Sequence, residues 1–160
     1  MDGNGQEIFV DGYNKDNSYR ITSEYVAGFF DGEGCIRVLG SSKNKYVGLH
    51  LFITNTYKPI LEKLKSKYGG SVVLRTKSTD KHRTYYQWRL SSKSDISRFI
   101  YDIIDFSIEK RAQLLLGLEY CNLPTLTVNR HSSKYPEVLL QQLKRKEIAE
   151  QMSRLKKINY

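Results

Sequence analysis

A short segment from Thr22 to Gly34, with the sequence Thr-Ser-Glu-Tyr-Val-Ala-Gly-Phe-Phe-Asp-Gly-Glu-Gly, constrains the fold of this chain most. Thr22 or Ser23 can cap a helix that has one apolar side and one small side. Gly28 and Gly32 lie four residues apart, although a glycine in a helix interior costs about 1 kcal/mol relative to alanine. A short helix that carries this cost is expected to recover it in close packing, so we expect a second helix to approach its glycines.

Two carboxylates stand at the end of this helix, in the sequence Asp31-Gly32-Glu33-Gly34. The glycines permit a tight exit from the helix and hold both carboxylates beside the packed seam. A carboxylate in such a place is either a structural cap or a metal ligand.

The nine residues from Val26 to Gly34, Val-Ala-Gly-Phe-Phe-Asp-Gly-Glu-Gly, resemble the LAGLIDADG motif of homing endonucleases. Val26 stands in place of the first Leu of the motif, and Gly32-Glu33-Gly34 in place of its closing Ala-Asp-Gly. The order of the elements that follow also agrees, so the resemblance covers roughly residues 22 to 122. It implies a single-motif, homodimeric member of that family, with the αββαββα fold.

Composition favours one domain with a nucleic-acid partner. The chain has 160 residues, of which 39% are hydrophobic, and no apolar run approaches the roughly 20 residues that span a bilayer. The net charge of +9 is uneven, because residues 1–33 carry 2 basic and 7 acidic side chains whereas residues 34–111 carry 16 and 6. A basic central segment indicates a face that binds a polyanion.

Two similar units follow the motif helix, and each contains a hairpin and a helix. Residues 47–53 alternate between apolar and other side chains, which is typical of a strand with one buried face. We expect strands over 35–39, 46–53, 71–77 and 84–90, and helices over 54–68, 92–104, 107–121 and 135–157.

The expected fold is therefore α+β, with a four-stranded antiparallel sheet. The family resemblance implies that this sheet forms a DNA-binding saddle. Residues 1–21 are expected to form an arm, and residues 22–160 a single domain. Within this domain, residues 22–122 are the core, and residues 123–160 add a loop and a basic helix. The lysines and arginine of that helix can reach phosphates or simply form a solvated face.

The two faces of the predicted sheet carry different side chains. Helices are expected to cover one face, which holds Ile36, Val38, Val47, Leu49, Leu51, Ile53, Val72, Leu74, Tyr86, Trp88 and Leu90. The other face holds Cys35, Arg37, Leu39, Tyr46, Gly48, His50, Phe52, Val73, Arg75, Lys77, Tyr85, Gln87 and Arg89.

This second face is predicted to bind double-stranded DNA. It mixes side chains that bond base edges and phosphates with apolar side chains that can touch thymine methyl groups. It contains no acidic residue, whereas an ordinary solvated face would carry more Glu and Thr. We expect Lys43, Lys45 and Arg83 of the hairpin turns to join the contact. A slip of one residue in any strand would exchange the two faces.

The family resemblance implies a catalytic centre at the end of the motif helix. Glu33 matches the last acid of the motif, which is the metal ligand in the family, and the carbonyl group of Gly32 is expected to assist. Oxygen ligands suit Mg²⁺, or another divalent cation such as Mn²⁺, and such an ion activates water for phosphodiester hydrolysis. Asp31 is expected instead to close the helix end.

Four further residues match positions of the family's catalytic network. Lys110 matches a lysine at the start of the helix after the second unit, and Gln113 matches the glutamine that follows three residues later. Asn55 matches a polar residue just after the second strand, and Lys58 is a weaker match for an arginine. By itself Lys110 would be interpreted as a surface lysine, so its role depends on the motif.

The chain offers one such acid, whereas a duplex has two strands. A second motif is absent from the sequence, so the resemblance implies a homodimer whose motif helices pack at their small faces. Tyr25, Ala27, Gly28 and Asp31 are expected in this interface. A two-fold dimer also predicts a pseudo-palindromic DNA site.

The leading hypothesis is a site-specific homing endonuclease, encoded in a mobile intron or intein, which makes double-strand cuts. One alternative is a maturase that binds intron RNA and helps it to splice without cutting. The other is a DNA-binding regulator whose catalytic site has been lost. Cys35 and Cys121 lack metal-ligand spacing, and no secretory signal is evident, so we expect an intracellular location in an organelle or a prokaryotic cytoplasm.

Overall fold

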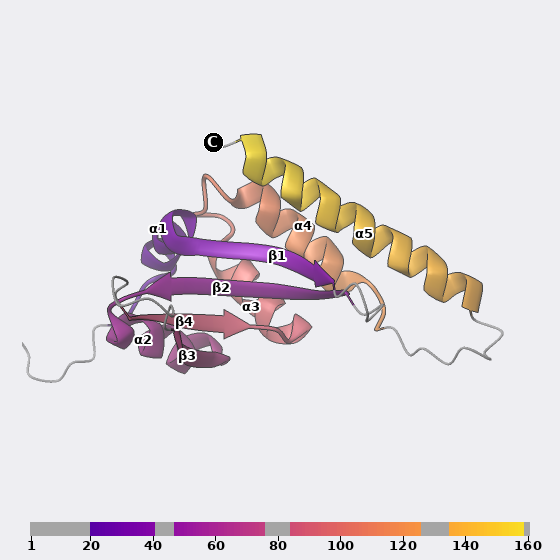
Figure 1. Cartoon of the computed structure of the whole chain (residues 1–160). Helices are drawn as coiled ribbons and strands as arrows, with labels where there is room; N and C mark the ends of the chain where they lie inside the picture. The colour runs from indigo at the N-terminus through magenta and orange to yellow at the C-terminus, as the bar shows by residue number, and fades with distance from the viewer. Residues whose placement is uncertain (1–19, 41–46, 76–83, 126–134, 159–160) are drawn as a thin grey trace, which may run out of the picture.

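The computed structural model describes residues 20–40, 47–75, 84–125 and 135–158. Its elements follow the predicted order of a helix, a hairpin, a helix, a hairpin and further helices, which confirms the α+β fold (Figure 1). No helix in these ranges is long and apolar enough to cross a membrane. The elements are α1 (Ser23–Glu33), β1 (Gly34–Gly40), β2 (Val47–Asn55), α2 (Lys58–Tyr68), β3 (Ser71–Arg75), β4 (Tyr85–Leu90), α3 (Lys93–Ile103), α4 (Arg111–Asn122) and α5 (Tyr135–Ile158).

The four strands form one antiparallel sheet in the order β1-β2-β4-β3. Both hairpins therefore lie side by side, with their second strands paired at the centre. Gly34, the first residue of β1, lies opposite Ile53 near the end of β2. The exit of α1 is consequently fixed beside the end of a central strand.

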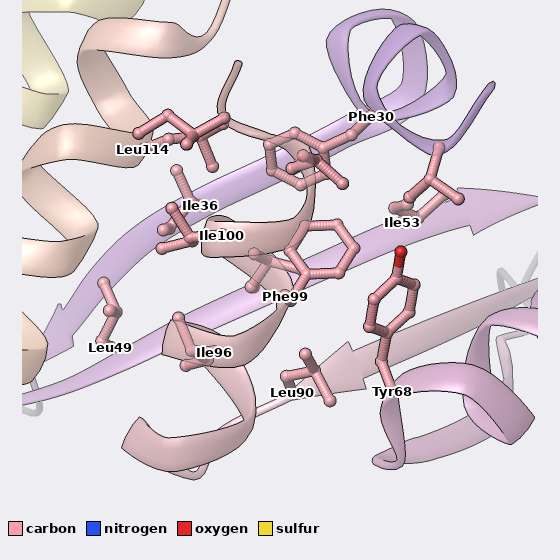
Figure 2. Packing of buried hydrophobic residues seen from close by; sticks show 14 of the residues in the cluster. Phe30, Ile36, Leu49, Ile53, Tyr68, Leu90, Ile96, Phe99, Ile100 and Leu114 are labelled. Atoms are coloured by element: carbon pink, nitrogen blue, oxygen red, sulfur yellow. The ribbon is translucent and has the colours of Figure 1, made fainter. Parts of the chain in front are cut away.

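Helices cover one face of this sheet, and the core lies between the two layers (Figure 2). Trp88 on β4, Phe99 on α3 and Tyr68 on α2 form an aromatic cluster, with ring centroids 4.9–6.1 Å apart. Phe30 of α1 contacts Phe99 edge to face at 5.4 Å. Burial of these large rings contributes strongly to stability, because each removes about 150–250 Å² from water.

The predicted buried face is confirmed at most of its positions. Ile36, Leu49, Leu51, Ile53, Trp88 and Leu90 are at most 3% exposed, and Val38, Val72 and Tyr86 are half-buried. The prediction is wrong for Leu74, which is 58% exposed. This residue lies next to the end of the edge strand β3, where the helix layer leaves it uncovered. The side chain of Val47 lies outside the part of the chain that the structure describes.

Two glycines end α2, as the sequence predicts. Gly69 and Gly70 have φ angles of 80° and 81°, a left-handed region that other residues rarely adopt. The Gly69 carbonyl accepts a hydrogen bond of 2.9 Å from the indole of Trp88. The turn therefore reverses the chain direction so that β3 can join the sheet. It also provides a hydrogen-bond acceptor for the indole N–H of Trp88, the largest side chain of the core.

The last helix differs from expectation at Arg145, which was expected to reach phosphates or to lie on a solvated face. Ile148 and Met152 of α5 are buried against the core, and the helix lies along β1 and α4 (Figure 1). Leu140 and Leu143 are 56% and 63% exposed, whereas Arg145 is 2% exposed. The Arg145 guanidinium donates to the Pro124 carbonyl and lies 5.6 Å from the ring centroid of Tyr120. These contacts allow the arginine to be buried, although the sequence predicts that it is exposed to solvent.

Asp31 ties α1 to the loop before α4. Its carboxylate accepts hydrogen bonds from the Ser107 hydroxyl at 2.6 Å and from the backbone N–H groups of Ile108, Glu109 and Lys110 at 2.7, 3.2 and 3.1 Å. Partial burial raises the pKa of Asp31, but the four hydrogen bonds together outweigh burial and hold this pKa below its usual value of 3.8. The expectation that the Asp31 side chain closes the end of its own helix is wrong, because this carboxylate caps the loop before α4.

We predict that Asp31→Asn lowers the free energy of unfolding at pH 7 by about 1–3 kcal/mol, because charge-assisted hydrogen bonds are lost. A carboxyl whose pKa is depressed on folding contributes stability above its unfolded pKa and loses it as the pH falls. The difference between wild type and Asp31→Asn should therefore shrink below pH 3.8. Urea denaturation at several pH values measures it.

Asp105→Asn is the matched control, since this carboxylate is 80% exposed and makes one 3.6 Å ion pair with Arg111. It should change stability by less than about 1 kcal/mol. Equal effects of the two variants would contradict the bracing role of Asp31.

Candidate nucleic-acid interface

The face of the sheet opposite the helices is open and carries the predicted polar set. Strand register places its side chains in rows, such as Cys35, Phe52, Arg89 and Ser71 across all four strands. The described positions on this face are Cys35, Arg37, Leu39, Gly48, His50, Phe52, Val73, Arg75, Tyr85, Gln87 and Arg89, as predicted. Lys43, Lys45, Tyr46, Lys77 and Arg83 lie outside the described residues.

Arginines on this face are held in place by their neighbours. The Arg37 guanidinium lies 4.9 Å from the ring centroid of Phe52, and Arg75 donates to Gln87 Oε1 at 3.2 Å. Arg89 donates to the Ser71 hydroxyl at 3.3 Å. None of the described positions on this face carries an acid, so these charges have no anionic partner there. Such an arrangement attracts a polyanion and is ordered before binding.

His50 lies directly opposite Arg37 and is half-buried. Burial, followed by the charges of Arg37 and Arg89, lowers the pKa of His50, so the imidazole is neutral at physiological pH. A Cβ in place of the Gly48 hydrogen would lie only 3.1 Å from His50 Nε2, so a larger residue there would require the imidazole to shift slightly. A neutral imidazole presents one donor and one acceptor, a pattern suited to base edges.

Glu33 is the last residue of α1 and is exposed. Within the described residues its carboxylate has no hydrogen-bond or ion-pair partner, unlike Asp31. Gly32 precedes it and is also exposed. The described part of the chain contains no cluster of three or more His, Cys, Asp or Glu side chains that could hold a metal. The described part of one chain thus supplies one free carboxylate, that of Glu33, at this end of the sheet.

Two of the predicted catalytic residues lie at the same end. The Lys110 ammonium donates to the carbonyl of Asp31, two residues before Glu33, and lies 3.8 Å from Glu109. Asn55 ends β2, whose neighbouring residues pair with the start of β1. The Asn55 side-chain oxygen accepts a 2.8 Å hydrogen bond from the backbone of Tyr57, so its amide N–H₂ group remains for other partners.

The other two predicted catalytic residues are placed differently. Gln113 is 4% exposed, and its side-chain oxygen has no hydrogen-bond partner in the described structure. A side chain so deeply buried cannot contact a substrate directly. The Lys58 ammonium pairs with Glu62 at 3.3 Å and lies 5.8 Å from the ring of Tyr86, a residue of the helix-covered face. Lys58 is therefore turned away from the open face.

The outer face of α1 has the small side chains that the sequence predicts. A methyl group built at Gly28 or Gly32 would meet no atom within 4 Å, and Tyr25 is 50% exposed. Ala27 is fully buried in its own core, so its predicted place in a dimer interface is wrong. Asp31 is half-buried and its carboxylate is hydrogen-bonded within its own chain, so its place in that interface stays a prediction.

Three residues at this site are missing from the sequence prediction. Strand alternation, carried one step further, would have added Thr54 opposite Gln87 and Ser71 opposite Arg89. Lys156 of α5 lies with its ammonium 3.0 Å from Cys35 Sγ. Only the spacing of four residues from Met152 could have indicated that this lysine faces the sheet.

Similar folds occur among homing endonucleases. A crystal structure of I-CvuI in complex with the I-CreI target has a TM-score of 0.61 and 18% identity, over 83% of this chain and 80% of that chain. The archaeal intron-encoded I-Vdi141I, complexed with DNA, has a TM-score of 0.62 and 18% identity over 83% and 82%. I-SmaMI bound to cleaved DNA has a TM-score of 0.54 and 21% identity, over 78% of this chain but 41% of that chain.

These identities are low, so the structural likeness establishes the fold alone. No curated protein matches the sequence. The sequence pattern of the LAGLIDADG endonuclease matches residues 26–114, which is more than half of the chain. This protein therefore belongs to the LAGLIDADG endonuclease family.

Proposed function

We propose that this protein is a homodimeric, divalent-metal-dependent DNA endonuclease that makes double-strand cuts in a long pseudo-palindromic site. The observation that carries the proposal is the unpaired Glu33 carboxylate at the end of α1. It stands beside a sheet face that holds Arg37, Arg75 and Arg89 and, at its described positions, no acid. Without a bound divalent cation, a free carboxylate next to a phosphate-binding surface would repel the phosphates of the DNA.

Duplex DNA fits the open face in shape and charge. Two adjacent antiparallel hairpins can follow the major groove, where arginine and glutamine bond to base edges. All three of the similar structures described above were determined with DNA, which supports the same ligand class here. The intramolecular partners of Arg37 and Arg75 position the side chains before DNA arrives and so reduce the entropy lost on binding.

A second copy of the chain completes the site. One Glu33 can serve one strand, and the open glycines of α1 leave room for a partner helix at close range. A two-fold axis there would bring both Glu33 residues together under the two strands.

The residues at the end of α1 fit a hard divalent cation. Carboxylate and carbonyl oxygens are the ligands that magnesium prefers, and Glu33 and Gly32 supply one of each. Magnesium, when bound, stabilises charge on the phosphate and lowers the pKa of a coordinated water. Lys110, whose ammonium lies at the same helix end, would stabilise negative charge on the phosphate, and the free amide group of Asn55 would orient a water.

We predict that Glu33→Gln abolishes cleavage while DNA binding and thermal stability persist. The loss should be at least about 100-fold, the scale of removing one electrostatic stabiliser from an active site. The assay incubates protein with a pool of randomised duplexes, with and without Mg²⁺, and sequences the ends of any products. Glu119→Gln, an exposed carboxylate on α4, is the matched control and should cut normally.

Other results of this assay would contradict the proposal. Duplex binding without cleavage by the wild type in any divalent ion would make the protein a regulator. Preference for structured intron RNA over duplex DNA would make it a maturase. Loss of folding in Glu33→Gln would instead show that this carboxylate is structural.

A further inference from the structure

The core-facing stripe of α5 ends in a lysine. Ile148 and Met152, four residues apart, are 3% and 1% exposed, and Lys156 follows after another four. Residues spaced by four lie on one side of a helix, so Lys156 points toward the sheet. It is half-buried, whereas the neighbouring Lys157 is exposed.

The Lys156 ammonium reaches the rim of the open face. Its Nζ lies 3.0 Å from Cys35 Sγ, and Cys35 belongs to the row that continues through Phe52 and Arg89. Cys35 is also only two residues beyond Glu33. Because α5 runs along the edge strand β1 (Figure 1), the helix delivers this charge from the side of the sheet to the end where Glu33 lies.

This ammonium lacks a carboxylate partner among the described residues. By contrast, Lys146 of the same helix lies 4.0 Å from Glu150, and Lys58 of α2 pairs with Glu62. A partly desolvated cation without a counter-ion interacts more strongly with an arriving anion than an exposed cation does. The thiol of Cys35 holds the side chain in place but does not neutralise it.

We propose that Lys156 binds a backbone phosphate of the DNA, beside the strand that Glu33 serves, and so makes α5 part of the nucleic-acid interface. This inference rests on the proposed function. It also assigns a role to α5, which lies outside the residues 26–114 that match the family pattern. A phosphate is the expected partner, because lysine acts as a compact point charge and stands at the sheet edge, where the duplex backbone rises out of the groove.

Salt dependence of DNA binding tests this assignment. Each phosphate that the protein neutralises steepens the plot of log K against log salt by about 0.9. The probe is a fluorescein-labelled duplex of randomised sequence, titrated without divalent ions at several salt concentrations. Three variants are compared with wild type: Lys156→Met, Lys156→Arg and Lys146→Met.

Lys156→Met should bind more weakly, and its salt slope should be shallower by about 0.9 for each copy of the chain on the duplex. Methionine continues the apolar stripe of α5, so the fold should be kept, which thermal unfolding verifies. Lys156→Arg should restore the slope. Lys146→Met removes the same charge from the same helix at a salt-bridged position and should leave the slope unchanged.

An unchanged slope in Lys156→Met, with wild-type binding, would overturn the assignment and leave Lys156 as a packing residue. Equal losses in Lys156→Met and Lys146→Met would also overturn it, because the effect would then come from net charge. Absence of salt-dependent duplex binding by the wild type would overturn the proposed DNA-binding function itself.

Discussion

The carboxylate of Asp31 holds the candidate catalytic end of the molecule together. It accepts one hydroxyl and three backbone donors from residues 107–110, and so joins α1 to the loop that leads into α4. This contact fixes Lys110 beside the exit of α1, where its ammonium meets the Asp31 carbonyl. The two acids of the motif therefore have different roles. The Asp31 carboxylate accepts hydrogen bonds from four donors, whereas the Glu33 carboxylate has no partner among the described residues.

The remaining features of the site follow from that division. Because α1 is clamped at its end and buried through Val26, Ala27 and Phe30, its opposite side can stay small and open. The glycines cost helix stability in a single chain, since each gives up about 1 kcal/mol relative to alanine. A contact with the α1 helix of a second copy would offset this cost. The proposed cleavage of both DNA strands needs a second carboxylate, and the same copy would supply it.

Much of the fold could be predicted from the sequence because its signals are local and agree with one another. Strand alternation, the glycine pair after α2 and the motif itself identify the order of elements and both faces of the sheet. The errors are long-range. Ala27 is small, like the glycines beside it, but lies on the buried side of α1. Leu74 alternates correctly but lies near the end of the edge strand β3, where the helices leave it uncovered. Helical spacing alone could not distinguish the buried Arg145 from the exposed Leu143.

The pairing of α1 helices is tested most directly by a disulfide across the proposed two-fold axis. Gly28→Cys adds a thiol where no atom lies within 4 Å, so the fold should tolerate it. On mild oxidation the account predicts a covalent dimer for Gly28→Cys, and none for the wild type or for Ser66→Cys on the exposed side of α2. A Gly28→Cys protein that stays monomeric, or cross-links no faster than Ser66→Cys, would contradict the account.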